Sequence, residues 1–123
     1  MTTPAYDTVN WFQIGTDDSA TAQRFYSELF GWKFTLDPKD AYSLISFRGD
    51  EQPSGGMTAT DPESNHANFL VVVRDVAAAC AKAEAAGGKV VVPAITAPSG
   101  LVFATIADPA GNEFGVYSPP PSP

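Results

Sequence analysis

The hydrophobic and polar positions of the first half of the chain predict a strand, a helix and three further strands. Apolar and polar residues partly alternate over 9–14, as in a half-buried strand. Over 22–30 the apolar residues recur at helical spacing and form the stripe of an amphipathic helix. Asp18 offers an N-cap oxygen to this helix, and Gly31 offers a C-terminal stop. The three following strands are predicted over 32–36, 42–47 and 54–59.

The second half of the chain repeats this pattern. Asp75 caps a predicted Ala-rich helix over 76–86, which ends at Gly87 and Gly88. The caps Asp18 and Asp75 lie 57 residues apart, close to half of the chain. We therefore interpret the chain as an internal duplication of a βαβββ unit, which gives an α+β fold. The predicted strands of this half cover 68–73, 89–92, 101–106 and 113–117.

Two such units determine the expected domain organisation. Their helices can cover one side of a sheet, and the other side is then free to curl around a concave pocket. Small ligands bind in concave surfaces of this kind. We predict a single domain over 8–118, with one module over about 8–60 and the other over about 66–118. The ends, 1–7 and 119–123, are expected to be flexible tails.

Composition and charge restrict the possible partners. The 123 residues include 7 basic and 14 acidic ones, which gives a formal net charge of −7. This charge repels phosphate backbones and anionic membranes, so no nucleic acid and no membrane is expected as a partner. Since no signal peptide or spanning segment is visible, a cytoplasmic location is expected. Having one cysteine, Cys80, and one histidine, His66, the chain cannot form a disulfide framework or a multi-histidine metal site alone.

Three segments, taken in their order and spacing, carry a resemblance to a known family. They are WFQIGTDD (11–18) with FYSELFGW (25–32), FLVVVRD (69–75) with AEAAGGK (83–89), and ADPAGNEFG (107–115). In these segments the chain resembles the vicinal oxygen chelate (VOC) superfamily of glyoxalase, bleomycin resistance and dioxygenase proteins. The resemblance implies two tandem βαβββ modules that form a curled mixed sheet around a concave pocket.

The resemblance also marks the positions at which a metal would be bound. Metal-dependent members of the superfamily hold a divalent ion with His, Gln or Glu side chains on the opening and closing strands of both units. Carried over one position at a time, these places fall on Trp11, Met57, Phe69 and Gly115, with Asn68 replacing Phe69 if the register slips by one. Trp, Met, Phe and Gly are not ligands for a hard divalent ion, so neither a metal nor another cofactor is expected.

Neighbouring residues with possible chemistry are given simpler interpretations. His66 is expected to be a solvent-exposed loop residue, and Cys80 a packed thiol within a helix. Gln13 and Glu113 are expected to be polar groups of the pocket and its rim. Alternation places Trp11 and Gln13 on the pocket face of the first strand, with Phe12 and Ile14 facing the helix; likewise Phe114 and Val116 of the last strand face the helices. Tyr42, Phe47 and Phe103 could line the pocket or belong to the core.

The predicted pocket is aromatic and apolar, and no catalytic residue is assigned. By resemblance to the drug-binding members of the superfamily, we expect a metal-independent homodimer that binds a small aromatic or hydrophobic molecule. Two alternatives remain: a VOC enzyme (a metal-dependent lyase, isomerase or dioxygenase), or a dimerisation or partner-binding module without a ligand. Glyoxalase I activity is not expected, because the metal positions are apolar. The candidate ligand-binding residues are Trp11, Gln13, Met57, Phe69, Phe103, Glu113, Gly115 and Tyr117.

Overall fold

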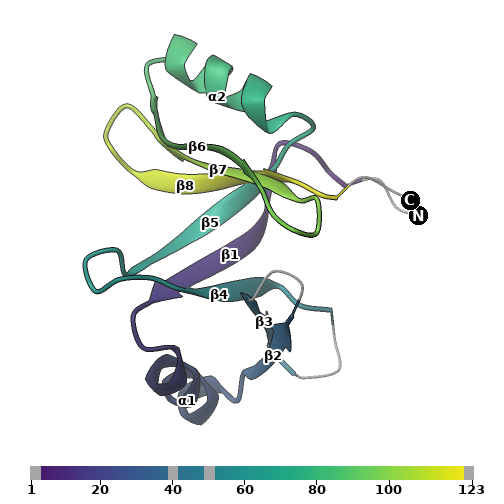
Figure 1. Cartoon of the computed structure of the whole chain (residues 1–123), viewed down its shortest axis with the longest axis vertical. Helices are drawn as coiled ribbons and strands as arrows, with labels where there is room; N and C mark the ends of the chain where they lie inside the picture. The colour runs from purple at the N-terminus through teal and green to yellow at the C-terminus, as the bar shows by residue number, and fades with distance from the viewer. Residues whose placement is uncertain (1–3, 39–41, 49–51, 121–123) are drawn as a thin grey trace. The chain divides into compact units, whose positions relative to one another are not determined.

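The computed structural model describes residues 4–38, 42–48 and 52–120 and confirms the predicted α+β fold (Figure 1). Contacts divide the chain into two compact units. The N-terminal unit is Trp11–Ala67, and the C-terminal unit combines Asn68–Pro123 with Met1–Asn10. The elements are β1 (Thr8–Thr16), α1 (Ser19–Phe30), β2 (Lys33–Asp37), β3 (Tyr42–Ser46), β4 (Gly55–Ala59), β5 (His66–Val72), α2 (Val76–Ala85), β6 (Lys89–Thr96), β7 (Val102–Ala107) and β8 (Glu113–Ser118).

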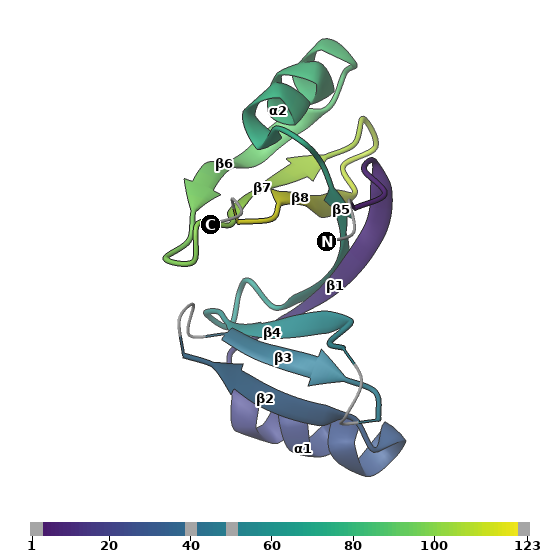
Figure 2. The same ribbon diagram turned by 90° about the vertical axis from the view of Figure 1, so that its right-hand side faces the viewer.

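The sheet of the N-terminal unit has the strand order β2-β3-β4-β1, with β4 parallel to β1 and antiparallel to β3 (Figure 2). Ile14, Ile45 and Met57 form the buried core on the face that carries α1. Phe12 and Trp32 pack against this core from its margin. The predicted orientation of Phe12 and Ile14 toward the helix is therefore confirmed.

Aromatic rings extend this core on the same face. Trp32 stacks on Tyr26 with ring centroids 5.3 Å apart and 8° between the planes. Phe47 stacks on Phe12 at 6.0 Å and 2°. Phe47 therefore lies on the face of α1, beside the core rather than within it, and is 39% exposed.

The sheet of the C-terminal unit has the order β5-β8-β7-β6. β5 and β8 run parallel, whereas β8, β7 and β6 are antiparallel neighbours. Its buried core lies beneath α2 and consists of Val73, Val76, Ala104, Ile106 and Val116. Cys80 and Phe114 pack against this core, as the sequence predicts.

Both helices begin at the predicted aspartates. The Asp18 carboxylate accepts hydrogen bonds from the Thr21 N–H at 3.1 Å and the Thr21 hydroxyl at 2.8 Å, and these bonds lower the pKa of Asp18. The Asp75 carboxylate accepts from the Ala78 N–H at 3.0 Å. α1 ends at Gly31, whose φ of 75° suits glycine and whose N–H donates to the Ser27 carbonyl. The repeated cap supports the interpretation of an internal duplication.

The ends of the predicted domain are only partly described. The Asp7 N–H donates to the Val72 carbonyl at 2.7 Å. The Arg74 guanidinium lies 4.3 Å from the centroid of the Tyr6 ring, a cation–π contact. Residues 4–7 thus have contacts within the C-terminal unit, while 1–3 and 121–123, which belong to the expected tails, lie outside the described residues.

β6 is longer than the sequence pattern predicts. It continues to Thr96 although Pro93 lies within it, and its pairing with β7 shifts register between Val90 and Val92 and again between Val92 and Ile95. β6 is the last strand of the sheet order, and an edge strand tolerates a proline because the missing N–H can face outward. The sequence pattern ended the strand at the proline, whereas the edge position allows it to continue.

Candidate functional site

The N-terminal unit gathers aromatic and polar side chains on the sheet face opposite α1. In the pairing of β1 with β4, Gln13 lies beside Gly56 and Ile14 lies beside Met57. Paired residues share a face, so Gln13 and Gly56 lie opposite the helix, and Met57 lies beneath it. Met57 is 2% exposed within the core, and its expected place on the pocket face is wrong. Gly56 takes that place.

A chain of four hydrogen bonds connects the side chains of this face. The Trp11 indole N–H donates to the Tyr42 hydroxyl at 3.1 Å, and that hydroxyl donates to Gln13 Oε1 at 3.1 Å. Gln13 Nε2 lies 3.2 Å from His66 Nε2, and His66 Nδ1 lies 2.8 Å from the Ser64 carbonyl oxygen. We call Trp11, Gln13, Tyr42 and His66 the amide face, because the carboxamide of Gln13 lies at its centre.

The two ends of this series of hydrogen bonds fix the direction of every bond in it. An indole N–H can only donate, and a backbone carbonyl can only accept. His66 Nδ1 must therefore carry a proton to bind Ser64. In the neutral ring His66 Nε2 is then an acceptor for Gln13 Nε2, and Gln13 Oε1 is left to accept from Tyr42. The geometry thus assigns both the amide orientation and the histidine tautomer.

Two glycines give the rings of the amide face their close approach to the backbone. A Cβ atom on Gly56 would lie 2.0 Å from the Tyr42 ring, and one on Gly15 would lie 2.2 Å from the His66 ring. Only glycine leaves this space, so both rings lie directly over backbone. The expectation of an exposed loop histidine is wrong, because His66 begins β5, is half-buried and uses both ring nitrogens.

The C-terminal unit places most of its predicted residues on the sheet face opposite α2. In register, Gly115 pairs with Leu70 and Thr105, and Tyr117 pairs with Phe103. The Tyr117 hydroxyl accepts a hydrogen bond from Asn10 Nδ2 at 2.8 Å. Glu113, two residues before Gly115, shares this face and is exposed at the start of β8. Alternation therefore placed Glu113, Gly115 and Tyr117 together, as the structure has them.

Two expectations for this unit need correction. Phe69 stacks on Phe114 with centroids 5.4 Å apart and 10° between the planes, so it lies on the face of α2 and is 46% exposed. Asn68 occupies the opposite face, and its Oδ1 atom is buried without a hydrogen-bond partner. Gly115 leaves no open space for a ligand, because a Cβ there would lie 2.6 Å from the Leu70 side chain. Leu70 fills that space.

These faces and the order of their elements agree with a match to a protein family. The family model of the Glyoxalase/Bleomycin resistance protein/Dioxygenase superfamily matches residues 8–116. The chain belongs to this superfamily. Two mycobacterial relatives, from Mycobacterium bovis and Mycobacterium tuberculosis and both named "Putative glyoxylase CFP32", are each 29% identical over 120 residues. The match covers 89% of this chain and 45% of either relative, so the chain spans less than half of their length.

Solved structures show the same fold. Methylmalonyl-CoA epimerase from Mycobacterium tuberculosis is similar with a TM-score of 0.64 and 16% identity, over 98% of this chain and 93% of that one. A glyoxalase/bleomycin resistance protein/dioxygenase superfamily member from Vibrio splendidus has a TM-score of 0.60 and 14% identity, over 90% and 99% of the two chains. At these identities the likeness concerns the fold of the superfamily.

The metal positions of the superfamily do not fit a hard divalent ion in this chain. The N-terminal unit has the indole of Trp11 and the bare backbone of Gly56 at its two positions, and an indole N–H is only a donor. The C-terminal unit has Asn68, with one amide oxygen, and Gly115. Within 4–38, 42–48 and 52–120, three or more His, Cys, Asp or Glu side chains are nowhere grouped to hold a metal.

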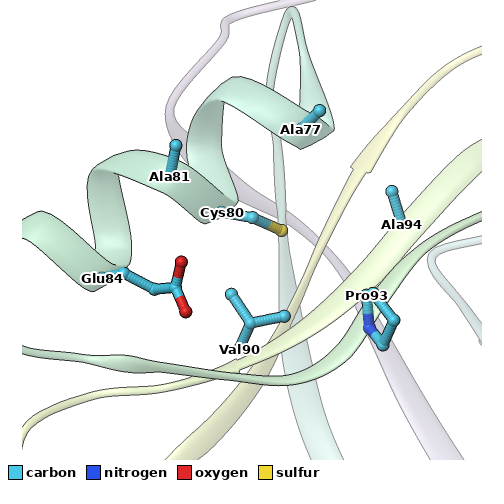
Figure 3. A pocket seen from close by; sticks show the side chains of 7 residues that line it. All are labelled: Ala77, Cys80, Ala81, Glu84, Val90, Pro93 and Ala94. Atoms are coloured by element: carbon cyan, nitrogen blue, oxygen red, sulfur yellow. The ribbon is translucent and has the colours of Figure 1, made fainter.

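A groove of about 370 Å³ lies elsewhere in the C-terminal unit, between α2 and β6 (Figure 3). Burial raises the pKa of the Cys80 thiol in this groove, and the charge of Glu84 raises it further. A thiol with a raised pKa is a poor nucleophile at neutral pH. None of the predicted site residues lines the groove, whose lining is Ala77, Cys80, Ala81, Glu84, Val90, Pro93 and Ala94.

Among the described helices, neither is long and apolar enough to cross a bilayer.

Burial raises the pKa of Tyr42 to about 12, although its bond from Trp11 acts in the opposite direction. The ordinary value is 10.0. We expect one of the four tyrosines to ionise near pH 12 in a titration followed by absorbance at 295 nm, and this step to disappear in Tyr42→Phe but persist in Tyr117→Phe. Because the folded pKa is the higher one, the contribution of Tyr42 to stability is complete below pH 10 and is lost as the pH rises through about 12. A full-amplitude step near pH 10 would contradict this assignment.

Proposed function

We propose that this protein binds a small aromatic or hydrophobic molecule on the amide face without the help of a metal ion. The observation that carries the proposal is the ordered row of Trp11, Tyr42 and Gln13, which are hydrogen-bonded to one another on the sheet face opposite α1. Such a row combines aromatic surface with a polar group of defined orientation, as small-molecule sites do.

The aromatic members of the row suit a planar ligand. Trp11 and Tyr42 are both half-buried, so their rings keep contact surface for another molecule. Stacked or edge-on aromatic pairs add about 0.5–1.5 kcal/mol beyond the burial of area. Because each ring is already held by hydrogen bonds, little further ordering is needed when a ligand binds.

The donor atoms of the amide face support binding without a metal. Trp11 offers only an N–H, and His66 has both ring nitrogens engaged, by Gln13 and Ser64. To reach His66 Nε2, a metal would have to displace its hydrogen bond with Gln13. Gln13 would then be free to turn, and the hydrogen bond that orders Tyr42 would be lost with it. The relatives' names, with "glyoxylase" and "epimerase", describe those proteins; we propose a binding role for this chain.

The proposal is tested by screening planar aromatic compounds through tryptophan fluorescence in the presence of EDTA. The chain has two tryptophans, and Trp32 lies in the aromatic core beside α1. A Trp32→Phe variant therefore leaves Trp11 as the reporter. We expect a bound compound to change its emission. Trp11→Ala removes this reporter, so the affinities of the variants are compared by isothermal titration calorimetry. Trp11→Ala or Gln13→Ala is expected to weaken affinity about tenfold or more, which is about 1.4 kcal/mol.

Gln23→Ala is the matched control for Gln13→Ala. Gln23 is also a half-buried glutamine, but it lies on α1 and donates to the Ser43 hydroxyl. Its replacement is expected to leave affinity unchanged. Binding that needed an added metal, or that was indifferent to both Trp11 and Gln13, would refute the proposal.

A further inference from the structure

The hydrogen-bond directions on the amide face make the orientation of the Gln13 carboxamide depend on His66. Gln13 can point its carboxamide either way, since the oxygen and nitrogen ends have the same shape. With Nδ1 bound to the Ser64 carbonyl, the neutral ring offers only an acceptor toward Gln13. This acceptor holds the NH₂ end of Gln13 toward His66 and the oxygen end toward Tyr42.

We propose that His66 is a positioning residue that fixes the orientation of the Gln13 carboxamide and thereby selects the ligand groups that the amide face accepts. This inference rests on the proposed function. After its bonds to Tyr42 and His66, Gln13 keeps one N–H and one oxygen lone pair. These are matched by a planar neutral ligand that carries an adjacent C=O and N–H, such as an aromatic lactam.

Protonation of His66 would reverse this arrangement. The imidazolium donates from both nitrogens, so Nε2–H would face the Gln13 NH₂ group. If the amide turned over, its NH₂ end would meet the Tyr42 hydroxyl, which already receives the Trp11 N–H. The Tyr42 hydroxyl proton would then lose its acceptor. The ordered face and its affinity for a lactam are therefore expected to be lost in molecules whose His66 is protonated.

The groups that contact His66 in the described part of the chain carry no charge. β1 contributes the amide of Gln13 and the backbone of Gly15, and neither of these titrates. Tyr42, connected through Gln13, stays protonated because burial raises its pKa to about 12. Along the chain the nearest acidic residues are Asp61 and Glu63, in the turn before β5. From β1's end, the carboxylate of Asp17 accepts a hydrogen bond from Asn65, the residue before His66, at 2.8 Å.

The first experiment uses the protein without any ligand, so its outcome does not depend on the proposed function. As the chain has one histidine, a long-range ¹H–¹⁵N spectrum reports His66 alone. We expect the Nδ1–H tautomer at pH 8, and a shift of the Trp11 indole N–H resonance with the same midpoint as His66. The inference would be overturned by the Nε2–H tautomer, or by a Trp11 indole resonance that does not shift when His66 changes its protonation state.

Two substitutions separate positioning from a merely structural role. His66→Gln keeps an acceptor at about the place of Nε2 but cannot titrate, whereas His66→Leu removes the acceptor. We expect His66→Gln to retain the position of the Trp11 indole resonance at pH 8 and to lose the pH dependence that this resonance has in the wild type. In His66→Leu the Trp11 indole resonance is expected to be displaced from its wild-type position at every pH. Circular dichroism checks that this variant folds. A persistent pH step in His66→Gln would contradict the proposal.

The ligand class is tested with 2-quinolone, an aromatic lactam, and with 2-methoxyquinoline, which lacks the N–H. At pH 8 we expect the wild type and His66→Gln to bind 2-quinolone about tenfold more tightly than 2-methoxyquinoline. In His66→Leu the two compounds are expected to bind equally. Equal affinities in the wild type would overturn the selection of ligand groups. If neither compound binds while the tautomer is as expected, the ligand class is refuted and the positioning of Gln13 stands.

Discussion

Replacing Ile45 by alanine is expected to lower the free energy of unfolding by about 2–5 kcal/mol. Ile45 is 0% exposed and lies with Ile14 and Met57 at the centre of the N-terminal core. The substitution removes buried methyl and methylene groups and leaves a cavity that the close-packed neighbours fill only in part. Urea unfolding followed by circular dichroism measures the effect.

Ile95→Ala is the matched control for this substitution. Ile95 is also on a strand, but it is 43% exposed on β6. The same atoms are removed from a site that is already partly hydrated, so a loss below about 1 kcal/mol is expected. Similar losses at Ile45 and Ile95 would show that the N-terminal core is less tightly packed than the structure has it.

Gly56→Ala is expected to abolish most of the binding at the amide face, with a loss of affinity of tenfold or more. The new Cβ would lie 2.0 Å from the Tyr42 ring, so the ring must move away. Movement breaks the bonds from Trp11 and to Gln13. The clash involves the far end of a side chain that can swing toward solvent, so the protein is expected to fold with a loss of about 1–3 kcal/mol.

The adjacent glycine supplies the control. A Cβ on Gly55 would meet the Phe12 ring at 2.4 Å, on the face of the core rather than the amide face. Gly55→Ala is therefore expected to destabilise the protein while leaving Tyr42 in place. Alkaline titration distinguishes the two variants, because the ionisation of Tyr42 near pH 12 should move toward 10 only in Gly56→Ala. If Gly56→Ala kept both the titration and the affinity, Tyr42 would not belong to the site.

The sequence identified the two helices, their aspartate caps and the faces of β1 and β8, because each has a local signal. Met57 and Phe69 were misplaced for physical reasons. Gly55 and Gly56 precede Met57 and have no side chains, so no alternation defines the register of β4. The stretch of β5 over 69–72 (FLVV) is apolar at every position, so the sequence shows no period of two there, although the structure buries these residues in alternation.

The amide face was found only in part, because its contacts join residues far apart in the sequence. Trp11 and Gln13 were expected there from alternation alone. Tyr42 meets Gln13 across 29 positions, and His66 meets it across 53. These meetings depend on the pairing register of β1, β3 and β4, and on two glycines whose lack of a side chain admits the rings. A local pattern carries no information on either condition.

The irregular edge strand β6 has a consequence for how the protein behaves at high concentration. A regular exposed edge is a template on which strands of other molecules can add, and extended aggregates grow in this way. Pro93 has no N–H to donate, and the two register shifts of β6 interrupt the even spacing of its backbone groups. A strand of another molecule that added along β6 would find no N–H at Pro93, so a continuous cross-β ladder is disfavoured at this edge.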